Sequence, residues 1–260
     1  MQVAIVTGAS KGLGRALSAG LVADGWSVVI DARGTGQLNE TAEWLRGGAA
    51  PGSTVVAVPG DVTSDDHRAA LVQAAAELGG LDMVVNNASS LGASPLPRLV
   101  DYPLDSLREV LETDVIAPVA LVQRSIQLLV RSPNPRVLDI TSDASVEHYE
   151  GWGGYGLAKA ALDHLTATIG VEVPQLRAWA LDPGDLRTDM HQAAFPGEDI
   201  SDRPLPETAV PRLLALVASD LPSGRYRAGD IPTRSDAGVG SSPGVRDASL
   251  PRANLEEVGR

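Results

Sequence analysis

Six short, almost continuously apolar runs recur along the chain, and a helical pattern follows each of them. The runs are Gln2–Val6, Ser27–Asp31, Thr54–Val58, Leu81–Asn86, Arg136–Thr141 and Leu176–Leu181. The helical patterns are Leu13–Asp24, Gln37–Arg46, Ser64–Leu78, Leu104–Arg131, Tyr155–Val173 and Glu207–Ser219, and residues 225–229 form a candidate seventh strand. Strands that are buried on both faces of a parallel sheet read as continuous apolar runs. We therefore expect an α/β fold: a doubly wound parallel sheet of six or seven strands with helices on both faces.

Two segments interrupt this alternation. Residues 1–230 contain all the expected elements and are enough for one sizeable core, so we expect a single domain there. Residues 231–260 are rich in glycine, serine, proline and arginine, which predicts a flexible or irregular tail. Residues 189–206 carry three prolines, several charges and Phe195. Long excursions of this kind are usually functional when they lie near a site.

The composition argues against several classes of function. The formal net charge is −12 at pH 7, which disfavours a nucleic-acid-binding surface. The chain has no cysteine, so it offers neither disulfides nor a thiolate metal site, and its four histidines lack metal-ligand spacing. The first apolar run begins at residue 2 and no apolar stretch reaches membrane-spanning length. We expect a soluble, cytoplasmic protein with no signal peptide, no membrane span and no metal.

A glycine-rich turn joins the first apolar run to the first helical pattern. It reads Thr7-Gly8-Ala9-Ser10-Lys11-Gly12-Leu13-Gly14. Glycines let the backbone approach a pyrophosphate closely, and a helix N-terminus offers unpaired N–H donors and the positive end of the helix dipole. The turn therefore indicates a dinucleotide site, although an ordinary strand-to-helix turn can carry the same glycines.

Tyr155 and Lys159 stand four residues apart, and Ser142 stands thirteen residues before the tyrosine. Positions i and i+4 share one face of a helix, so the spacing places an ammonium beside a phenol. The positive charge favours phenolate and is expected to lower the pKa of the phenol toward the working range of an acid–base catalyst. A hydroxyl from a neighbouring strand end can then orient a carbonyl oxygen. Taken alone, the pair also fits a surface contact between an aromatic ring and a lysine.

Together these motifs resemble the short-chain dehydrogenases/reductases, in their shorter single-domain branch. The matching residues, in order, are Thr7-Gly8-x-x-x-Gly12-x-Gly14, Asp61-Val62, Asn86-Asn87-Ala88, Ser142, Tyr155-x-x-x-Lys159 and Pro183-Gly184-x-Leu186-x-Thr188. The resemblance spans residues 2 to 230 and implies a Rossmann-type fold. It also implies hydride transfer between a nicotinamide cofactor and a carbonyl or alcohol carbon, with the protein supplying orientation and a proton.

The resemblance also implies residue roles. Ser142 would hold the substrate oxygen, Tyr155 would donate the proton during reduction, and Lys159 would lower the tyrosine pKa and hold the nicotinamide ribose. The implied cofactor-binding residues are Gly8, Ser10, Lys11, Gly12, Leu13, Gly14, Arg33, Asp61, Val62, Asn87, Ala88, Tyr155, Lys159, Pro183, Gly184, Leu186 and Thr188. Asp61 and Val62 are expected at the adenine, and the last four residues at the nicotinamide.

The end of the second apolar run favours NADP(H) over NAD(H). The family's acidic position, which binds the ribose hydroxyls of NAD, falls on Ala32, and Arg33 stands where NADP-using members often place an arginine. Lys11 is a second cation that the family associates with the extra phosphate. Asp31 keeps the alternative open, because a register shift of one residue would put its carboxylate in the acidic slot.

One implied catalytic position departs from the family. An asparagine usually stands twenty-eight residues before the serine, where this chain has Asp114, which we keep as a catalytic candidate. In the family the main-chain carbonyl of this residue binds a water that leads to the lysine. Pro118 has no N–H, so it would leave the Asp114 carbonyl free and kink the helix. The alternative is that Pro118 only breaks the helix and Asp114 caps it.

The substrate is expected to be a small carbonyl or alcohol compound that the sequence does not name. Its candidate contacts are Ser89, Leu91, Ala93, Ser94, His148, Tyr149, Trp152, Met190, His191 and Phe195. The resemblance places a mobile substrate lid at residues 189–206. It also implies a homodimer or homotetramer built on the helices around 104–131 and 155–173. The residues expected on their outer faces are Val119, Ala120, Val122, Ala161, Leu165 and Ile169.

Two other function classes share parts of this pattern. A non-catalytic nucleotide sensor or scaffold on the same fold commonly lacks the tyrosine or the lysine, and this chain keeps both. A sugar-nucleotide epimerase or dehydratase needs a different glycine spacing and a larger carboxyl-terminal substrate domain. We therefore predict an NADP(H)-dependent oxidoreductase that interconverts a ketone or aldehyde and an alcohol, with the nucleotide sensor as the alternative.

Overall fold

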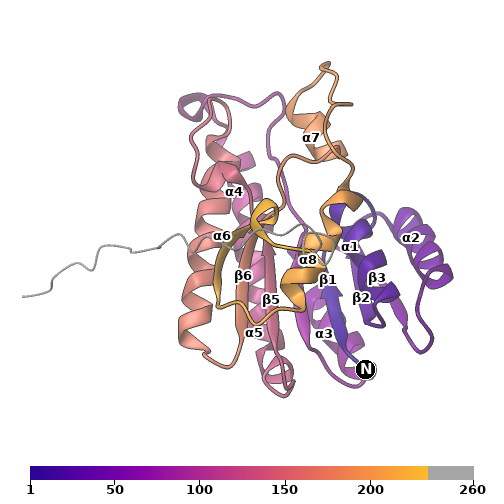
Figure 1. Ribbon diagram of the computed structural model, residues 1–260. Helices are drawn as coiled ribbons and strands as arrows, with labels where there is room; N and C mark the ends of the chain where they lie inside the picture. Colours follow the sequence, from indigo (N-terminus) through magenta and orange to yellow (C-terminus); the bar gives the residue numbers. More distant parts are fainter. Residues whose placement is uncertain (234–260) are drawn as a thin grey trace, which may run out of the picture.

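The computed structural model describes residues 1–233 and contains a seven-stranded sheet in the order β3-β2-β1-β4-β5-β6-β7 (Figure 1). Every pair of neighbouring strands is parallel. The strands are β1 Val3–Val6, β2 Ser27–Ala32, β3 Val55–Pro59, β4 Met83–Asn86, β5 Arg136–Ile140, β6 Arg177–Asp182 and β7 Gly224–Arg227. The predicted parallel sheet with a seventh strand is confirmed. Most of the predicted tail, residues 234–260, lies outside the described residues.

Helices cover both faces of the sheet, as the apolar runs predict. They are α1 Gly12–Ala23, α2 Thr35–Gly47, α3 Asp65–Glu77, α4 Leu104–Leu111, α5 Ala117–Leu129, α6 Gly153–Glu172, α7 Asp189–Ala194 and α8 Val210–Val217. Successive strand residues point to opposite faces. In β1, Ala4 and Val6 join the core beneath α1, α2 and α8, whereas Val3 and Ile5 join the core beneath α3 and α5. Because both faces are buried, every position of β1 is apolar.

The predicted helix over Leu104–Arg131 is interrupted. A π-helical turn, Glu112–Ile116, separates α4 from α5, and the Ala117 N–H donates to the Glu112 carbonyl five residues back. Pro118 has no N–H, so it cannot donate to the Asp114 carbonyl as an ordinary helical residue would. The single helical pattern over Leu104–Arg131 therefore corresponds to two helices. The expected irregularity lies in the turn that precedes the proline.

The segment after β6 contains a short helix that the sequence did not predict. Thr188 caps α7, because its hydroxyl accepts a hydrogen bond of 3.1 Å from the His191 N–H. Figure 1 shows α7 standing beyond the carboxyl ends of the strands. The single-turn 3-10 helices are η1 Leu99–Asp101, η3 Asp143–Ser145, η4 Pro206–Thr208 and η5 Ala228–Asp230.

Two residues predicted for subunit contact belong to the core of the protein's own fold. Val122 of α5 is buried in the core between the sheet and α3 and α5, and Ile169 of α6 packs against that core. Placing Val122 on an outer face was therefore wrong. The other four, Val119, Ala120, Ala161 and Leu165, are partly exposed.

Asp139 of β5 is a buried carboxyl group that the sequence analysis did not identify. Asn86 Nδ2 donates to its Oδ1 atom at 2.7 Å, and Thr166 Oγ1 donates to its Oδ2 atom at 2.6 Å. Burial raises the pKa of Asp139 to about 6, although both hydrogen bonds oppose the rise. The folded protein therefore holds this proton more tightly than the unfolded chain does.

The predicted consequence is a pH dependence of stability. Because the folded pKa of Asp139 exceeds the unfolded value, its stabilising contribution is complete below the unfolded pKa and is lost as pH rises through about 6. This group should lower the unfolding free energy by up to about 3 kcal/mol between pH 4 and pH 7. In Asp139→Asn that decrease should be absent, as measured by denaturant unfolding across this range. Asp105→Asn, which changes an exposed carboxylate of α4, is the control. Parallel profiles for wild type and Asp139→Asn would contradict the prediction.

Candidate active site

A cavity of about 1340 Å³ opens at the carboxyl edge of the sheet. Parallel strands all end at this edge, so the loops that follow β1 to β6 meet there. The predicted catalytic and cofactor-binding residues that line the cavity are Gly8, Ser10, Lys11, Gly12, Leu13, Arg33, Asp61, Val62, Asn87, Ala88, Ser142, Tyr155, Lys159, Pro183, Gly184, Leu186 and Thr188. Gly14 and Asp114 lie behind this wall rather than in it.

The glycine-rich turn packs closely against the loop after β4. Gly8 has a φ of +65°, and a Cβ atom there would lie 2.8 Å from the Cα atom of Ala88. At Gly14 a Cβ atom would lie 2.4 Å from Asn87 Nδ2, which donates to the Thr7 carbonyl at 2.8 Å. Gly14 therefore serves the packing of α1 against this loop and not the cavity surface.

The start of α1 suits a negatively charged ligand. Within α1, Lys11 at the N-cap makes no side-chain capping bond and the first turn carries no acidic residue. Backbone N–H donors and the positive end of the helix dipole therefore face the cavity at Gly12 and Leu13. The residues at this end of the cavity fit the pyrophosphate of a nicotinamide dinucleotide.

Asp31 supports the glycine-rich turn from below. The Gly8 N–H donates to its Oδ1 atom at 2.6 Å, and His67 Nε2 lies 3.0 Å from its Oδ2 atom. The side chain is almost fully buried, with both oxygens engaged. β2 ends one residue later at Ala32, and Arg33 lines the cavity. The sequence analysis missed His67, because no local pattern links residues that are 36 positions apart.

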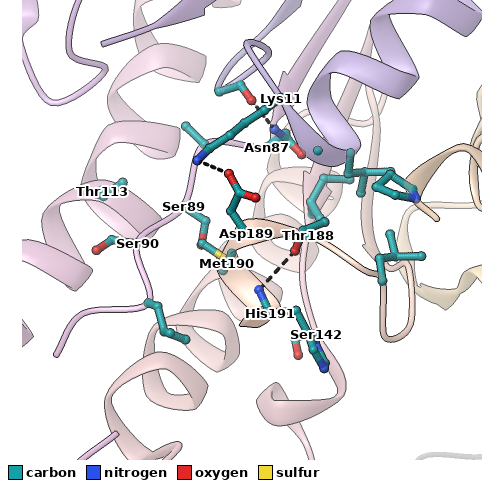
Figure 2. A pocket seen from close by; sticks show the side chains of 18 of the residues that line it. Lys11, Asn87, Ser89, Ser90, Thr113, Ser142, Thr188, Asp189, Met190 and His191 are labelled. Atoms are coloured by element: carbon teal, nitrogen blue, oxygen red, sulfur yellow. Dashed lines mark hydrogen bonds and ion pairs between the residues drawn. The ribbon is translucent and has the colours of Figure 1, made fainter. Parts of the chain in front are cut away.

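Lys11 has a partner that the sequence did not reveal. Its ammonium lies 2.7 Å from Asp189 Oδ2, at the start of α7 (Figure 2). Both side chains are exposed, so the pair is weak, but it joins the glycine-rich turn to the predicted lid. Arg15 also lines the cavity, with its guanidinium stacked 4.3 Å from the centroid of the Trp44 ring.

Tyr155 and Lys159 share the inner face of α6. Lys159 Nζ lies 5.4 Å from the centroid of the Tyr155 ring and donates to the Ile140 carbonyl at 3.0 Å. Lys159 is 2% exposed and Tyr155 is 9% exposed. A buried ammonium must have a counter-charge, and it has one in Asp114.

The Asp114 carboxylate is fully buried and receives three contacts. Ser89 Oγ donates to its Oδ2 atom at 2.7 Å, the Ser90 N–H donates to its Oδ1 atom at 2.7 Å, and Lys159 Nζ lies 3.5 Å from Oδ2. Asp114 stands inside the π turn and binds the loop after β4. The interpretation of Asp114 as a helix cap was therefore wrong, since Ile116 holds the N-cap position of α5.

Burial acts against ionisation of the Tyr155 phenol, and the neighbouring groups offset it only in part. Burial raises the pKa of Tyr155, and the Asp114 carboxylate adds to the rise. The Lys159 ammonium and the hydroxyls of Ser142 and Ser89 lower it by less. Burial also raises the pKa of Asp114. At Lys159, burial lowers the pKa of the ammonium, but Asp114 and Tyr155 raise it by more. The expected fall of the tyrosine pKa is therefore reversed in this structure, and the phenol keeps its proton.

Ser142 caps the 3-10 turn η3. Its Oγ atom accepts from the Ala144 N–H at 3.2 Å and donates to Asp143 Oδ1 at 2.9 Å. Its carbonyl accepts a bond of 3.0 Å from Arg225 Nη2, on β7. Arg225 also pairs with Asp163 of α6 at 3.1 Å, so the last strand and α6 together hold the Ser142 backbone. The sequence analysis found no role for Arg225.

Aromatic rings form the wall beyond the tyrosine. The Trp152 ring lies 5.7 Å from the Tyr155 ring and 6.0 Å from the Phe195 ring, measured between centroids. His191 packs 5.1 Å from Phe195, and its buried Nε2 atom has no hydrogen-bond partner among the described residues. This wall of the cavity is therefore aromatic and apolar, and the unsatisfied ring nitrogen lies buried within it.

Not all of the predicted substrate contacts reach this cavity. Those that line it are Ser89, Leu91, Tyr149, Trp152, Met190, His191 and Phe195. Ala93 and Ser94 do not, although Ser94 Oγ donates to the Ala193 carbonyl of α7 at 2.7 Å. His148 does not line this cavity either; it lines a neighbouring hollow beside η1.

Neither a metal cluster nor a membrane span occurs within residues 1–233. In that part of the chain no group of three or more acidic or histidine side chains could hold a metal ion. None of its helices is long and apolar enough to cross a membrane.

Comparison with known proteins identifies the family. The family profile described as short chain dehydrogenase matches residues 2–199. A sepiapterin reductase of Rattus norvegicus is 30% identical over 202 residues, which cover 74% of this chain and 77% of the relative. An alcohol dehydrogenase of the archaeon Thermococcus sibiricus, solved with 5-hydroxy-NADP, is 26% identical with a TM-score of 0.77, covering 87% of this chain and 95% of that one. A short chain dehydrogenase of Shigella flexneri, solved with NADP, shares the fold with a TM-score of 0.80 at 24% identity, covering 88% and 97%. The chain therefore belongs to the short chain dehydrogenase family and is an NAD(P)-dependent oxidoreductase.

Proposed function

We propose that this protein reduces a small ketone or aldehyde to an alcohol with NADPH. The observation that carries the proposal is the buried, protonated Tyr155 phenol, which lies beside Lys159 in the cavity that the glycine-rich turn also lines. The bound cofactor supplies the hydride to the carbonyl carbon. The Tyr155 phenol supplies the proton to the carbonyl oxygen, so that NADPH, a proton and the carbonyl compound yield NADP⁺ and the alcohol.

The neighbouring residues prepare this proton transfer. The Ser142 hydroxyl would turn from Asp143 toward the substrate oxygen, while the Ala144 N–H holds its position. As the proton leaves Tyr155, the Lys159 ammonium would stabilise the phenolate that remains. The names of two relatives, a sepiapterin reductase and an alcohol dehydrogenase, support chemistry that interconverts carbonyl and alcohol groups.

NADP(H) fits this site better than NAD(H). Asp31 lines the cavity, but both of its oxygens already contact Gly8 or His67, which makes its carboxylate a poorer acceptor for the ribose hydroxyls of NAD. Arg33 and Arg15 line the cavity at the same end and can receive the additional phosphate. Two similar structures were solved with NADP or an NADP derivative, which agrees with this preference.

The segment 189–206 is the substrate lid in this proposal. It brings Met190, His191 and Phe195 to the cavity, and it contacts the rest of the site through the Lys11–Asp189 pair. We also keep a homodimer and a single domain over residues 1–230 as parts of the proposal.

Replacement of Tyr155 tests the reaction directly. Tyr155→Phe removes the proton donor, so kcat should fall by about a thousandfold while the Kd for NADPH stays within about twofold. NADPH oxidation across a panel of aldehydes and ketones gives kcat, and calorimetry gives Kd. Tyr226→Phe, which removes a hydroxyl that donates to the Pro222 carbonyl outside the cavity, is the matched control. Near-normal turnover by Tyr155→Phe would refute the role. A wild type that binds NADPH but reduces no compound of the panel would favour a nucleotide sensor.

Cofactor preference forms a second test. The wild type should show a kcat/KM for NADPH about a hundredfold above that for NADH, and Arg33→Ser should reduce the NADPH value by about tenfold or more without changing the NADH value. Arg98→Ala removes an exposed arginine outside the cavity and should change neither value. A wild-type preference for NADH would disprove the assignment.

The unsatisfied nitrogen of His191 predicts a substrate preference. A buried polar atom without a partner is costly, so a substrate that turns the His191 ring toward the cavity and bonds to Nε2 is favoured over one that cannot. For His191→Phe, the KM for phenylpropanedione, an aromatic diketone, should rise about tenfold. The KM for propiophenone, which lacks the second carbonyl, should stay unchanged. Equal effects on both ketones would show that His191 contributes packing only.

A further inference from the structure

We infer that Asp114 keeps the Tyr155 phenol in its proton-donating form and thereby sets the pH range in which the enzyme reduces carbonyls. The inference rests on the proposed function and assigns to it a preferred direction. Asp114 does not line the cavity, so it acts through Tyr155 and Lys159 as a positioning residue.

The surroundings of Asp114 match a carboxylate better than an amide. Its three contacts come from the Ser89 hydroxyl, the Ser90 N–H and the Lys159 ammonium, and all three supply protons. A carboxylate has two oxygens that only accept, whereas an asparagine amide has one acceptor oxygen and one NH₂ donor. An NH₂ group in place of Oδ2 could donate to the Ser89 hydroxyl, but it would also face the Lys159 ammonium, which only donates. The three donors therefore favour the charged form of Asp114, whereas burial opposes it.

That charge changes what the lysine can do for the tyrosine. With asparagine at this position, the Lys159 ammonium would be the nearest full charge to the phenol and would favour phenolate. With aspartate, the carboxylate lies 3.5 Å from the ammonium and the pair is formally neutral. Burial raises the pKa of Tyr155, and the Asp114 charge is the strongest further effect in that direction.

The other groups that face this pair come from β5, α6, η3 and the loop after β4. Asp139 of β5 interacts electrostatically with Lys159, and Asp163 of α6 acts on Asp139 in turn. The hydroxyls of Ser89, after β4, and of Ser142, at η3, lie beside the phenol and lower its pKa. The Asp139 pKa is about 6, so this group is charged above that pH and adds to the negative field around Lys159. Among the carboxylates of residues 1–233, Asp114 is the one that contacts the Lys159 ammonium.

The Asp114 charge affects carbonyl reduction and alcohol oxidation in opposite ways. Carbonyl reduction needs the phenol as an acid, whereas alcohol oxidation needs the phenolate as a base. The kcat/KM for reduction should therefore stay high up to alkaline pH, and the kcat/KM for oxidation should rise only at alkaline pH. Removing the Asp114 charge should move both boundaries toward lower pH, as the shared tyrosine requires.

The test is the pH profile of Asp114→Asn in both directions. We expect the upper limb of kcat/KM for reduction and the lower limb for oxidation to move to lower pH together. At pH 8 the oxidation rate relative to its alkaline plateau should rise on the order of tenfold. Asp82→Asn is the matched control, since this carboxylate binds the Val3 N–H and the Ser132 hydroxyl at the opposite edge of the sheet. Unchanged limbs, or limbs that move to higher pH, would overturn the inference.

A second readout needs no turnover. In protein labelled with ¹³C at tyrosine Cζ, the Tyr155 signal, assigned by its loss in Tyr155→Phe, should titrate at lower pH in Asp114→Asn than in the wild type. Asp114→Ser, which also removes the charge, replaces Asp114→Asn if thermal unfolding shows that the amide variant does not fold. If no carbonyl compound is reduced but the NMR titration shifts as expected, the proposed function fails and the electrostatic role stands. If the enzyme reduces carbonyls and the titration does not shift, the role of Asp114 fails alone.

Discussion

Burial of a parallel sheet on both faces is the constraint on which the rest of this structure depends. The two apolar cores on either side of the sheet require helices on each face, and parallel strands then place every carboxyl end at one edge. The loops at that edge bring together the glycine-rich turn, Ser142, and the inner face of α6. The cavity is thus a consequence of the sheet topology, and its chemistry comes from the residues that this edge receives.

Ionisable groups beneath this edge are each met by named partners. Asp31 is engaged by a backbone N–H and a histidine, Asp139 by an amide and a hydroxyl, and Lys159 by a carbonyl and the Asp114 carboxylate. Buried polar groups need such partners, because each unsatisfied one is costly. Most of these contacts support a backbone turn or a reacting side chain from behind. The pKa of Tyr155 therefore depends in part on Asp114, which does not line the cavity.

Local sequence rules predicted the strands and α1, but they missed the π turn and the short helix α7. The strands and α1 followed from apolar runs and glycine spacing, since those signals reside in adjacent residues. Pro118 indicated an irregular helix, but the π turn depends on the backbone bond between Ala117 and Glu112. The short helix α7, which Thr188 caps, was missed because its six residues lie in a segment whose three prolines and scattered charges show no helical pattern.

The sequence by itself determined the order of strands and helices, the glycine-rich turn and the spacing of Tyr155 and Lys159, because each is a pattern of neighbouring residues. Only the tertiary structure decided which side chains meet: Asp114 with Lys159, Asp31 with His67, and Arg225 with the Ser142 carbonyl. The physical reason is distance along the chain. These partners come from different elements, so their contacts form only after the helices have packed on both faces of the sheet and the loops have met at its carboxyl edge.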